Sequence, residues 1–246
     1  MSVSITTVDS CASTNALLTA MTDAPHAAVV CAREQTAGRG QRGNSWEAEP
    51  GKNLTFSMLL RPAALHASRQ FEMSMVVSLA VADAIDAVLP DGIRTQIKWP
   101  NDIYVGLEKI CGILIENKLA GACIERAIAG IGINVNQAAF VSDAPNPTSV
   151  ILKNGGRETD LDAMLADVAD RIEQGFGAYE AEPDADSLKK RYMARLMWTA
   201  GQHPFADADG PFEARICDVE PDGTLLLSNG KRYAFKEVSY TIPPNH

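Results

Sequence analysis

Apolar residues along most of the chain recur in two spacings, one typical of helices and one typical of strands. Residues 69–89 are almost wholly apolar at helical spacing and predict a buried central helix. A second long helix is predicted behind Thr159 as N-cap, with Asp162 completing a pattern similar to a capping box. The predicted helices cover residues 14–21 (capped by Ser13), 69–89, the apolar positions from Leu161 to Tyr179, and 186–197.

Short apolar runs between turn signals predict the strands. Several of these runs are close enough in sequence to pair as antiparallel hairpins. We therefore predict an α+β fold with a mixed, largely antiparallel sheet. The predicted strands are residues 27–33, 54–61, 94–99, 103–105, 109–117 and 122–135.

The pattern changes after residue 197, where short β runs are punctuated by glycine and proline. Runs of this kind predict a small barrel of about 45 residues. We expect two domains, a main domain over residues 1–197 and a small C-terminal β domain over residues 198–246. The runs are residues 212–219, 224–227, 232–235 and 238–242.

The charge of the chain excludes several functions. Among its 246 residues, 31 are acidic and 22 are Lys or Arg, so the net charge is -9. Generic coating of nucleic acid and binding to anionic membranes both require the opposite sign. No uninterrupted apolar run approaches the roughly 18 residues of a membrane span, and the first ten residues do not resemble a signal peptide.

Cysteine and histidine usage indicates neither a disulfide framework nor a metal site. Five cysteines without a CxxC motif predict buried thiols in the cytoplasm, which is a reducing compartment. Four scattered histidines form no metal-ligand pattern. Cys11 and Cys111 lie near the motifs described below, but neither has a histidine base nearby in sequence, so a thiol nucleophile is not expected.

A polar segment over residues 34–53 carries the sequence GRGQRG at residues 38–43. Although this matches GxGxxG, the residues after it cannot continue as a helix, so a dinucleotide fingerprint is excluded. Two interpretations remain, a solvated surface loop or a ligand loop in which Arg39 and Arg42 bind anionic oxygens and Trp46 offers a flat face. The length of this loop favours the second.

Three further motifs have a structural and a functional interpretation. Asn101 and Asp102, in KWPND, suit nucleotide phosphates with a borrowed magnesium ion, or a turn bonded to its own backbone. Lys109 either holds a carboxylate or phosphoryl oxygen or faces solvent, while Gly112 inside a strand predicts a close approach. The glycine-broken stretch GIGINVN at residues 130–136 is either a bulge or a wall that reads a ring.

Taken in order, these motifs resemble the catalytic domain of the biotin protein ligases, also called biotin–[acetyl-CoA-carboxylase] ligases. The resemblance runs from about residue 10 to the end, where the last β module resembles the SH3-like domain of that family. It implies a class II synthetase-like fold in the main domain. The matching stretches are Ser13-Thr14-Asn15, Gln35-Thr36-Ala37-Gly38-Arg39-Gly40, Lys98-Trp99-Pro100-Asn101-Asp102, Lys109 with Gly112, and Gly132-Ile133-Asn134.

The resemblance implies a two-step reaction. Biotin and ATP would form biotinyl-5′-AMP, and a lysine of a biotin carboxyl carrier domain would then take the biotin. Arg39 and Lys109 would be the catalytic residues, and magnesium would accompany ATP near Asp102 without a site built by the protein alone. The implied biotin-binding residues are Ser13, Thr14, Asn15, Gln35, Arg39, Gly40, Gln41, Lys109 and Gly112, and the nucleotide-binding residues are Arg42, Trp46, Asn101, Asp102 and Asn134.

The chain departs from the family pattern at two positions and in one segment. Gln41 and Asn44 stand where members commonly carry arginine, so either Arg42 substitutes for these arginines or the loop holds the adenylate less firmly; our hypothesis is the second. Because the Ser-Thr-Asn motif begins at residue 13, the helix-turn-helix of the repressor members is not expected, nor is DNA binding. Exposed sheet edges would support a homodimer or docking of the carrier.

Other functions compete with the ligase. A lipoate or octanoyl transfer enzyme also modifies a carrier lysine, but the glycine loop with Trp46 and the KWPND motif fit biotin ligases better. A non-catalytic regulator that binds biotin would not need Lys109. A protein that only binds nucleotide would form neither AMP nor pyrophosphate.

Overall fold

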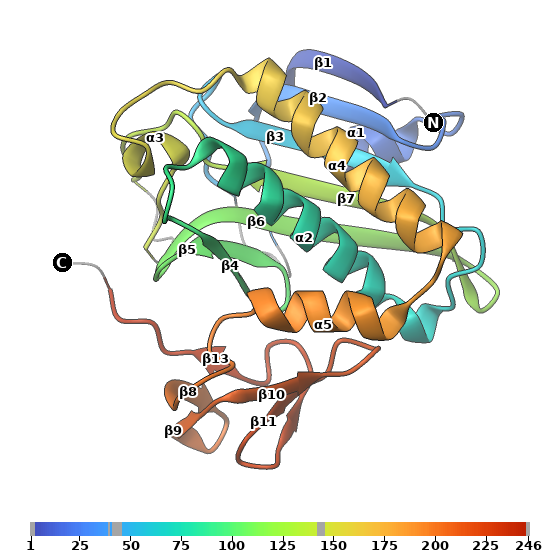
Figure 1. The fold of residues 1–246 in the computed structure, drawn as a ribbon. Coiled ribbons are helices and arrows are strands. Elements are labelled where there is room, and N and C mark those ends of the chain that lie inside the picture. Colours follow the sequence, from blue (N-terminus) through green and yellow to red (C-terminus); the bar gives the residue numbers. More distant parts are fainter. Residues whose placement is uncertain (1–2, 39, 41–45, 142–145, 245–246) are drawn as a thin grey trace.

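The computed structural model of the protein describes residues 3–38, 40, 46–141 and 146–244. A seven-stranded sheet in the order β1-β2-β3-β7-β6-β5-β4 forms its centre (Figure 1). β1 and β2 are parallel, whereas the other neighbours are antiparallel, so the predicted mixed, largely antiparallel sheet is confirmed. The strands are β1 (Ser4–Cys11), β2 (Ala28–Gln35), β3 (Leu54–Leu60), β4 (Thr95–Lys98), β5 (Asp102–Val105), β6 (Glu108–Ala120) and β7 (Cys123–Ile133).

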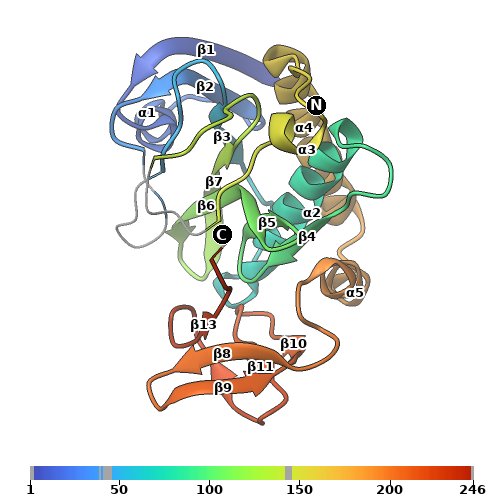
Figure 2. The ribbon, with the colours of Figure 1, turned by 90° about the vertical axis from the view of Figure 1, so that its left-hand side faces the viewer.

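Helices cover the two faces of this sheet unequally, as Figure 2 shows. On one face α2, α4 and α5 pack over the main apolar cluster, to which Ile131 and Ile133 of β7 contribute. On the other face α1 alone covers the first strands, where Leu18 packs in a smaller cluster with Ile128. The helices are α1 (Thr14–Ala20), α2 (Phe71–Val88), α3 (Val150–Lys153), α4 (Leu161–Ala181) and α5 (Ala185–Arg195), with a 3-10 turn, η2 (Ala67–Arg69).

Three local predictions need correction. β1 was not predicted, because most of its side chains are exposed and it shows no apolar alternation. The N-cap of α4 is Asp160 and not Thr159; the Asp160 carboxylate accepts hydrogen bonds from the amides of Asp162 and Ala163. Ser13 is the N-cap of α1 by position, but its side chain makes no capping hydrogen bond with any described residue.

The C-terminal segment folds into two three-stranded antiparallel sheets, β10-β11-β12 and β13-β8-β9. The strand predicted over residues 212–219 is broken at Arg215 into β9 and β10, which belong to different sheets. The β8 strand precedes the first predicted run. The strands are β8 (His203–Asp207), β9 (Gly210–Ala214), β10 (Ile216–Val219), β11 (Leu225–Leu227), β12 (Arg232–Tyr233) and β13 (Ser239–Tyr240).

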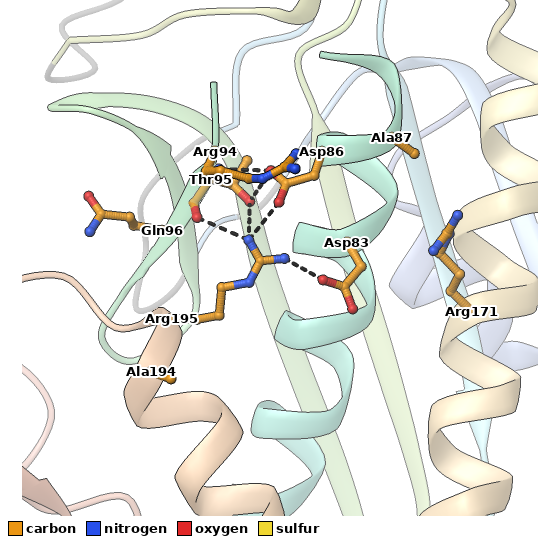
Figure 3. A pocket seen from close by; sticks show the side chains of 9 residues that line it. All are labelled: Asp83, Asp86, Ala87, Arg94, Thr95, Gln96, Arg171, Ala194 and Arg195. Carbon is orange, nitrogen blue, oxygen red and sulfur yellow. Dashed lines mark hydrogen bonds and ion pairs between the residues drawn. The ribbon is translucent and has the colours of Figure 1, made fainter. Parts of the chain in front are cut away.

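A charged cluster at the end of α5 ties three elements together (Figure 3). One guanidinium nitrogen of Arg195 lies 2.7 Å from Asp86 and 3.2 Å from the carbonyl of Thr95, and the other contacts Asp83. The Thr95 hydroxyl in turn donates to Asp86 over 2.8 Å. Because Thr95 begins β4, this cluster fixes the strand that leads to the KWPND motif.

The same motif contacts the C-terminal module. The indole nitrogen of Trp99 donates to the carbonyl of Gly223 over 3.0 Å, and the Trp99 ring meets that of Phe235 edge to face. On the far side of Gly223, an added β-carbon would lie 2.8 Å from the Phe71 ring. Gly223 is therefore held between a strand end and the start of α2.

Candidate functional site

On the sheet face that carries α1, the centre of the sheet presents glycine backbone in place of side chains. We call Gly112, Gly130 and Gly132 the glycine floor. Gly132 of β7 stands opposite Gly112 of β6, and Gly130 stands opposite Ser57 of β3. Positions in between point to the opposite face and carry large core side chains such as Ile131. Glycines at adjacent positions of neighbouring strands allow a flat group to lie directly on the sheet.

The start of α1 forms one wall of this floor. The Asn15 amide donates to Glu116 over 2.6 Å, and its oxygen accepts from Ser57 over 2.5 Å. Thr14 donates its backbone N–H to the Gln35 side chain over 2.8 Å. Because Ser13, Thr14 and Asn15 are all at least 93% buried, these bonds are required to offset desolvation. The predicted cluster of residues 13–15 with Gln35 is thus brought together.

Trp46 lies on the glycine floor. A β-carbon added at Gly132 would be 2.4 Å from the indole, and one at Gly112 would be 3.0 Å away. The Lys109 ammonium lies 5.8 Å from the centre of the Trp46 ring, within cation–π range. The indole nitrogen is buried without a hydrogen-bond partner among the described residues. Trp46 was predicted to bind nucleotide; its place is beside Gly112, a predicted biotin residue.

Lys109 stands at the edge of the floor and pairs with Asp102. Their ammonium and carboxylate are 2.9 Å apart, and each side chain is 23% exposed. The backbone of Lys109 is held by the following segment, since its N–H donates to Asn146 over 2.7 Å and its carbonyl accepts from Thr148 over 2.8 Å. Because the Lys109 side chain is partly exposed, its ammonium can contact an incoming anion while it stays paired with Asp102.

A second ammonium, that of Lys98, stands opposite Asp102 across the β4–β5 ladder. It lies 4.7 Å from the ring centre of Tyr240 and 5.7 Å from that of Tyr104. Burial lowers the pKa of Lys98, Asp102 opposes this shift and Lys109 adds to it. Lys109 is paired with Asp102, and the Lys98 ammonium also feels the charge of that carboxylate, so this corner carries two lysines for one carboxylate.

Next to Lys109 lie buried amides and hydroxyls with spare hydrogen-bonding capacity. Asn134 donates its side-chain amide to the carbonyl of Thr148 over 2.9 Å, yet its oxygen has no partner among the described residues, and nor has the Thr148 hydroxyl. Both residues are at least 96% buried. Unpaired buried acceptors and donors are costly, and a bound ring with polar edges would satisfy them. The Asn101 amide, in contrast, is bonded to the carbonyl of Ile113.

Some predicted residues cannot be placed. Arg39, Gln41, Arg42 and Asn44 lie outside the described residues, and Gly40 between them is partly exposed. The roles assigned to all of these residues therefore stay predictions.

The magnesium ion expected with ATP near Asp102 stays a prediction. Within the described ranges, no group of three or more His, Cys, Asp or Glu side chains is arranged for a metal ion. The carboxylate expected nearest to such an ion, that of Asp102, is already paired with Lys109. It can supply one oxygen ligand, whereas magnesium takes six.

The cysteine near the site is not an activated thiol. Cys111 is fully buried, and this burial, with a contribution from Asp102, raises the pKa of its thiol well above the usual value, although Lys109 opposes the shift. A protonated thiol is a poor nucleophile. All five cysteines are free, but only Cys31 and Cys111 are buried, so the prediction of buried thiols is wrong for Cys11, Cys123 and Cys217.

Two residues of the site were assigned no role from the sequence. Ser57 and Glu116 complete the hydrogen-bond network of Asn15 from positions 42 and 101 residues away in the chain. Ser57 stands in none of the motifs, whereas Glu116 ends the stretch that begins at Lys109, and only the pairing of β3, β7 and β6 brings both of them to Asn15.

Residues 8–134, more than half of the chain, match the model of the biotin/lipoate A/B protein ligase family. The chain belongs to this family. The match spans the start of α1, the glycine floor and the Lys109–Asp102 pair, so it covers most of the geometry described above. None of the helices in the described ranges has the length and hydropathy needed to cross a bilayer.

Individual relatives agree with this family. The chain is 34% identical over 210 residues to a biotin–[acetyl-CoA-carboxylase] ligase of Paracoccus denitrificans, covering 80% of this chain and 82% of that protein. It is 27% identical to the bifunctional ligase/repressor BirA of Bacillus spizizenii over 83% of its own length, but spans only 62% of that protein.

The fold is also that of solved members of the family. A biotin protein ligase from Aquifex aeolicus, solved with biotin and ATP, superposes with a TM-score of 0.78. The superposition covers 97% of this chain and 99% of that one at 24% identity. The C-terminal sheets are thus included in the shared architecture.

Proposed function

We propose that this chain is an ATP-dependent biotin–protein ligase. The observation that carries the proposal is the glycine floor with the Lys109–Asp102 pair at its edge, in a family whose Paracoccus member is named for this activity. The buried polar wall at residues 13–15 suits a compact polar ring, and the glycine floor with the Trp46 ring on it suits the apolar chain that follows.

In the first step, the carboxylate of biotin would attack the α-phosphorus of ATP, giving biotinyl-5′-AMP and pyrophosphate. Lys109, whose side chain lies 3.5 Å from a β-carbon added at Gly112, would stand where the carboxylate end of the acid and the α-phosphate meet. A fixed cation at that point stabilises the negative charge that builds up during transfer. No protein base is required, because the attacking carboxylate is already ionised at neutral pH.

In the second step, a lysine amine of a biotin carboxyl carrier domain would attack the carbonyl carbon of the mixed anhydride and release AMP. Magnesium belongs to the proposal only as a counter-ion of the ATP phosphates, where it would offset charge on the departing pyrophosphate. We also propose that β1, an unpaired edge of the sheet among the described strands, pairs with a second copy or with the carrier. The five free thiols support a cytoplasmic location.

The test is release of pyrophosphate from ATP and magnesium by the purified protein with biotin, lipoate or octanoate. We expect release with biotin, followed by transfer of label to a biotin carrier domain. Lys109→Met should slow pyrophosphate release by about 100-fold or more, because it removes the cation that would stabilise negative charge in the transition state.

Lys118→Met is the matched control, since Lys118 lies on the same strand and pairs with Glu125 at an exposed site. Release with lipoate or octanoate alone would assign the chain to the other branch of the family. Biotin binding without pyrophosphate from any acid would leave a binding protein and refute the proposal.

A further inference from the structure

The last residues of the chain return from the C-terminal module to the larger one, as both ribbon views show (Figures 1 and 2). Tyr240 ends β13 and pairs with Phe205 of β8, and the next residue still donates a hydrogen bond to Pro204 over 2.9 Å. From there the chain reaches Asn146, whose side-chain amide donates to the carbonyl of Pro243 over 2.7 Å. We call residues 240–243 the C-terminal strap.

One end of the strap contacts Lys98. The Tyr240 ring lies 4.7 Å from the Lys98 ammonium, and is itself held by Trp198 and Phe205 at ring distances of 4.8 and 5.0 Å. A ring fixed on two sides holds the ammonium in one place through cation–π attraction. The β4–β5 ladder places Lys98 opposite Asp102, and the Tyr240 ring fixes where its ammonium lies.

The other end of the strap acts on Lys109. Asn146 has a positive φ of 48°, a conformation that asparagine tolerates better than most residues. Its carbonyl accepts the hydrogen bond from the Lys109 backbone over 2.7 Å, while its side chain is bonded to the strap. The strap therefore holds the residue that orients Lys109.

We propose that the C-terminal strap positions both lysines around Asp102, and that ATP binding therefore depends on it more strongly than biotin binding does. The inference rests on the proposed function in taking ATP as the ligand. Tyr240 and Asn146 are positioning residues, because each acts through a lysine. On the acid side of the site, Lys109 is held by the strap, whereas Thr14 and Asn15 are held by Gln35, Ser57 and Glu116.

The test measures equilibrium binding of ATP and, separately, of biotin to the full-length protein and its variants. Tyr240→Leu should weaken ATP binding by about 5- to 30-fold, the worth of a partly desolvated cation–π contact. Asn146→Gly keeps the positive φ but removes the bond to Pro243, and should act in the same direction. Biotin affinity should fall less than ATP affinity, because biotin is also expected to contact the wall at residues 13–15, which is held by Gln35, Ser57 and Glu116.

Two further variants separate positioning from general damage. Tyr240→Phe retains the ring and should restore ATP binding. Phe212→Leu removes an aromatic contact to Phe205 within the same module without touching either lysine, and should leave ATP binding unchanged. Unchanged ATP affinity in Tyr240→Leu and Asn146→Gly, or equal losses of ATP and biotin affinity, would overturn the proposal.

Because ATP binding is measured without any acid, the result does not depend on whether biotin is the substrate. If the wild type binds ATP but releases no pyrophosphate with biotin, the proposed function fails while the strap is still tested. If pyrophosphate is released with biotin but Tyr240→Leu and Asn146→Gly bind ATP like the wild type, the proposed function stands and only the proposal about the strap is refuted.

Discussion

At the scale of single residues, glycines shape the site as much as the polar side chains do. A β-carbon at Gly130 would lie 2.2 Å from the oxygen of Asn15, closer than any stable contact. Asn15 in turn connects α1 to Ser57 and Glu116 on two different strands. One glycine therefore permits a hydrogen-bond network that joins three elements.

Substituting this glycine should damage the acid pocket. We expect Gly130→Ala to weaken biotin binding by about tenfold or more, because displacing Asn15 leaves buried polar groups unpaired at about 1–3 kcal/mol each. Titration calorimetry with biotin measures the loss. Gly177→Ala on α4 is the control: no described atom outside its helix lies within 4 Å of the added carbon. It should stabilise the helix by about 0.5–1 kcal/mol and leave biotin binding unchanged. Wild-type affinity in Gly130→Ala would contradict this account.

At this scale, the sequence predicted where a close approach occurs but not which residue makes it. Gly112 inside a strand predicted a close approach, and the structure shows one, but the group that approaches is Trp46. Strand periodicity identifies which residues share a face, whereas it does not tell which distant loop covers that face.

At the scale of elements, α5 is placed by charge rather than by a broad apolar face. Only Leu188 and Tyr192 of its side chains are buried, and Arg195 at its end joins it to α2 and β4. The Asp86 side chain that it pairs with is 11% exposed. Such a buried carboxylate needs its partner, since unpaired burial of charge is costly.

Arg195 and Arg171, both labelled in Figure 3, should therefore contribute differently to the free energy of unfolding. Arg195→Ala should lower the free energy of unfolding in urea by about 3 kcal/mol, because it leaves Asp86 without its cation. Arg171→Ala removes an ion pair with Asp167 in which both side chains are about 40% exposed, and should cost about 0.5 kcal/mol. Equal losses would mean that the Arg195 cluster adds nothing beyond a surface pair.

The long helices α2 and α4 were predictable because each carries a continuous apolar stripe that packs on the sheet. β1 was not, because an edge strand exposed on most positions has no alternation to read. The predicted strand over residues 212–219 was wrong because adjacent strands of two sheets can share one uninterrupted β-forming run. Only the long-range pairing distinguishes one strand from two.

At the scale of the whole molecule, the junction between the larger part and the C-terminal module is a set of specific contacts around Gly223. Trp99 donates to its carbonyl, and Phe71 packs where its side chain would be. The predicted boundary at residues 197 and 198 falls just after α5, which itself touches both parts. We expect the two parts to unfold together.

Gly223→Ala tests this coupling. Its φ of 96° strains any β-carbon, and the added carbon would also meet Phe71 at 2.8 Å. Gly230→Ala has a similar strain at φ 81°, yet no described atom lies within 4 Å of its added carbon. In calorimetry, Gly230→Ala should lower the Tm of a single transition, whereas Gly223→Ala should lower it further or split it in two. Equal shifts for both variants would show that the junction does not couple the parts.

The backbone floor under Trp46 also bears on how such a site can change over generations. Glycine is the smallest residue, so every substitution at Gly112, Gly130 or Gly132 adds atoms on the face that Trp46 and Asn15 cover. If this site binds an acid as proposed, substitutions at these positions can only exclude acids that it accepted before. A lineage that comes to accept a wider acid must therefore gain the room elsewhere, at Trp46 or at the Asn15 wall, where there are still atoms to remove.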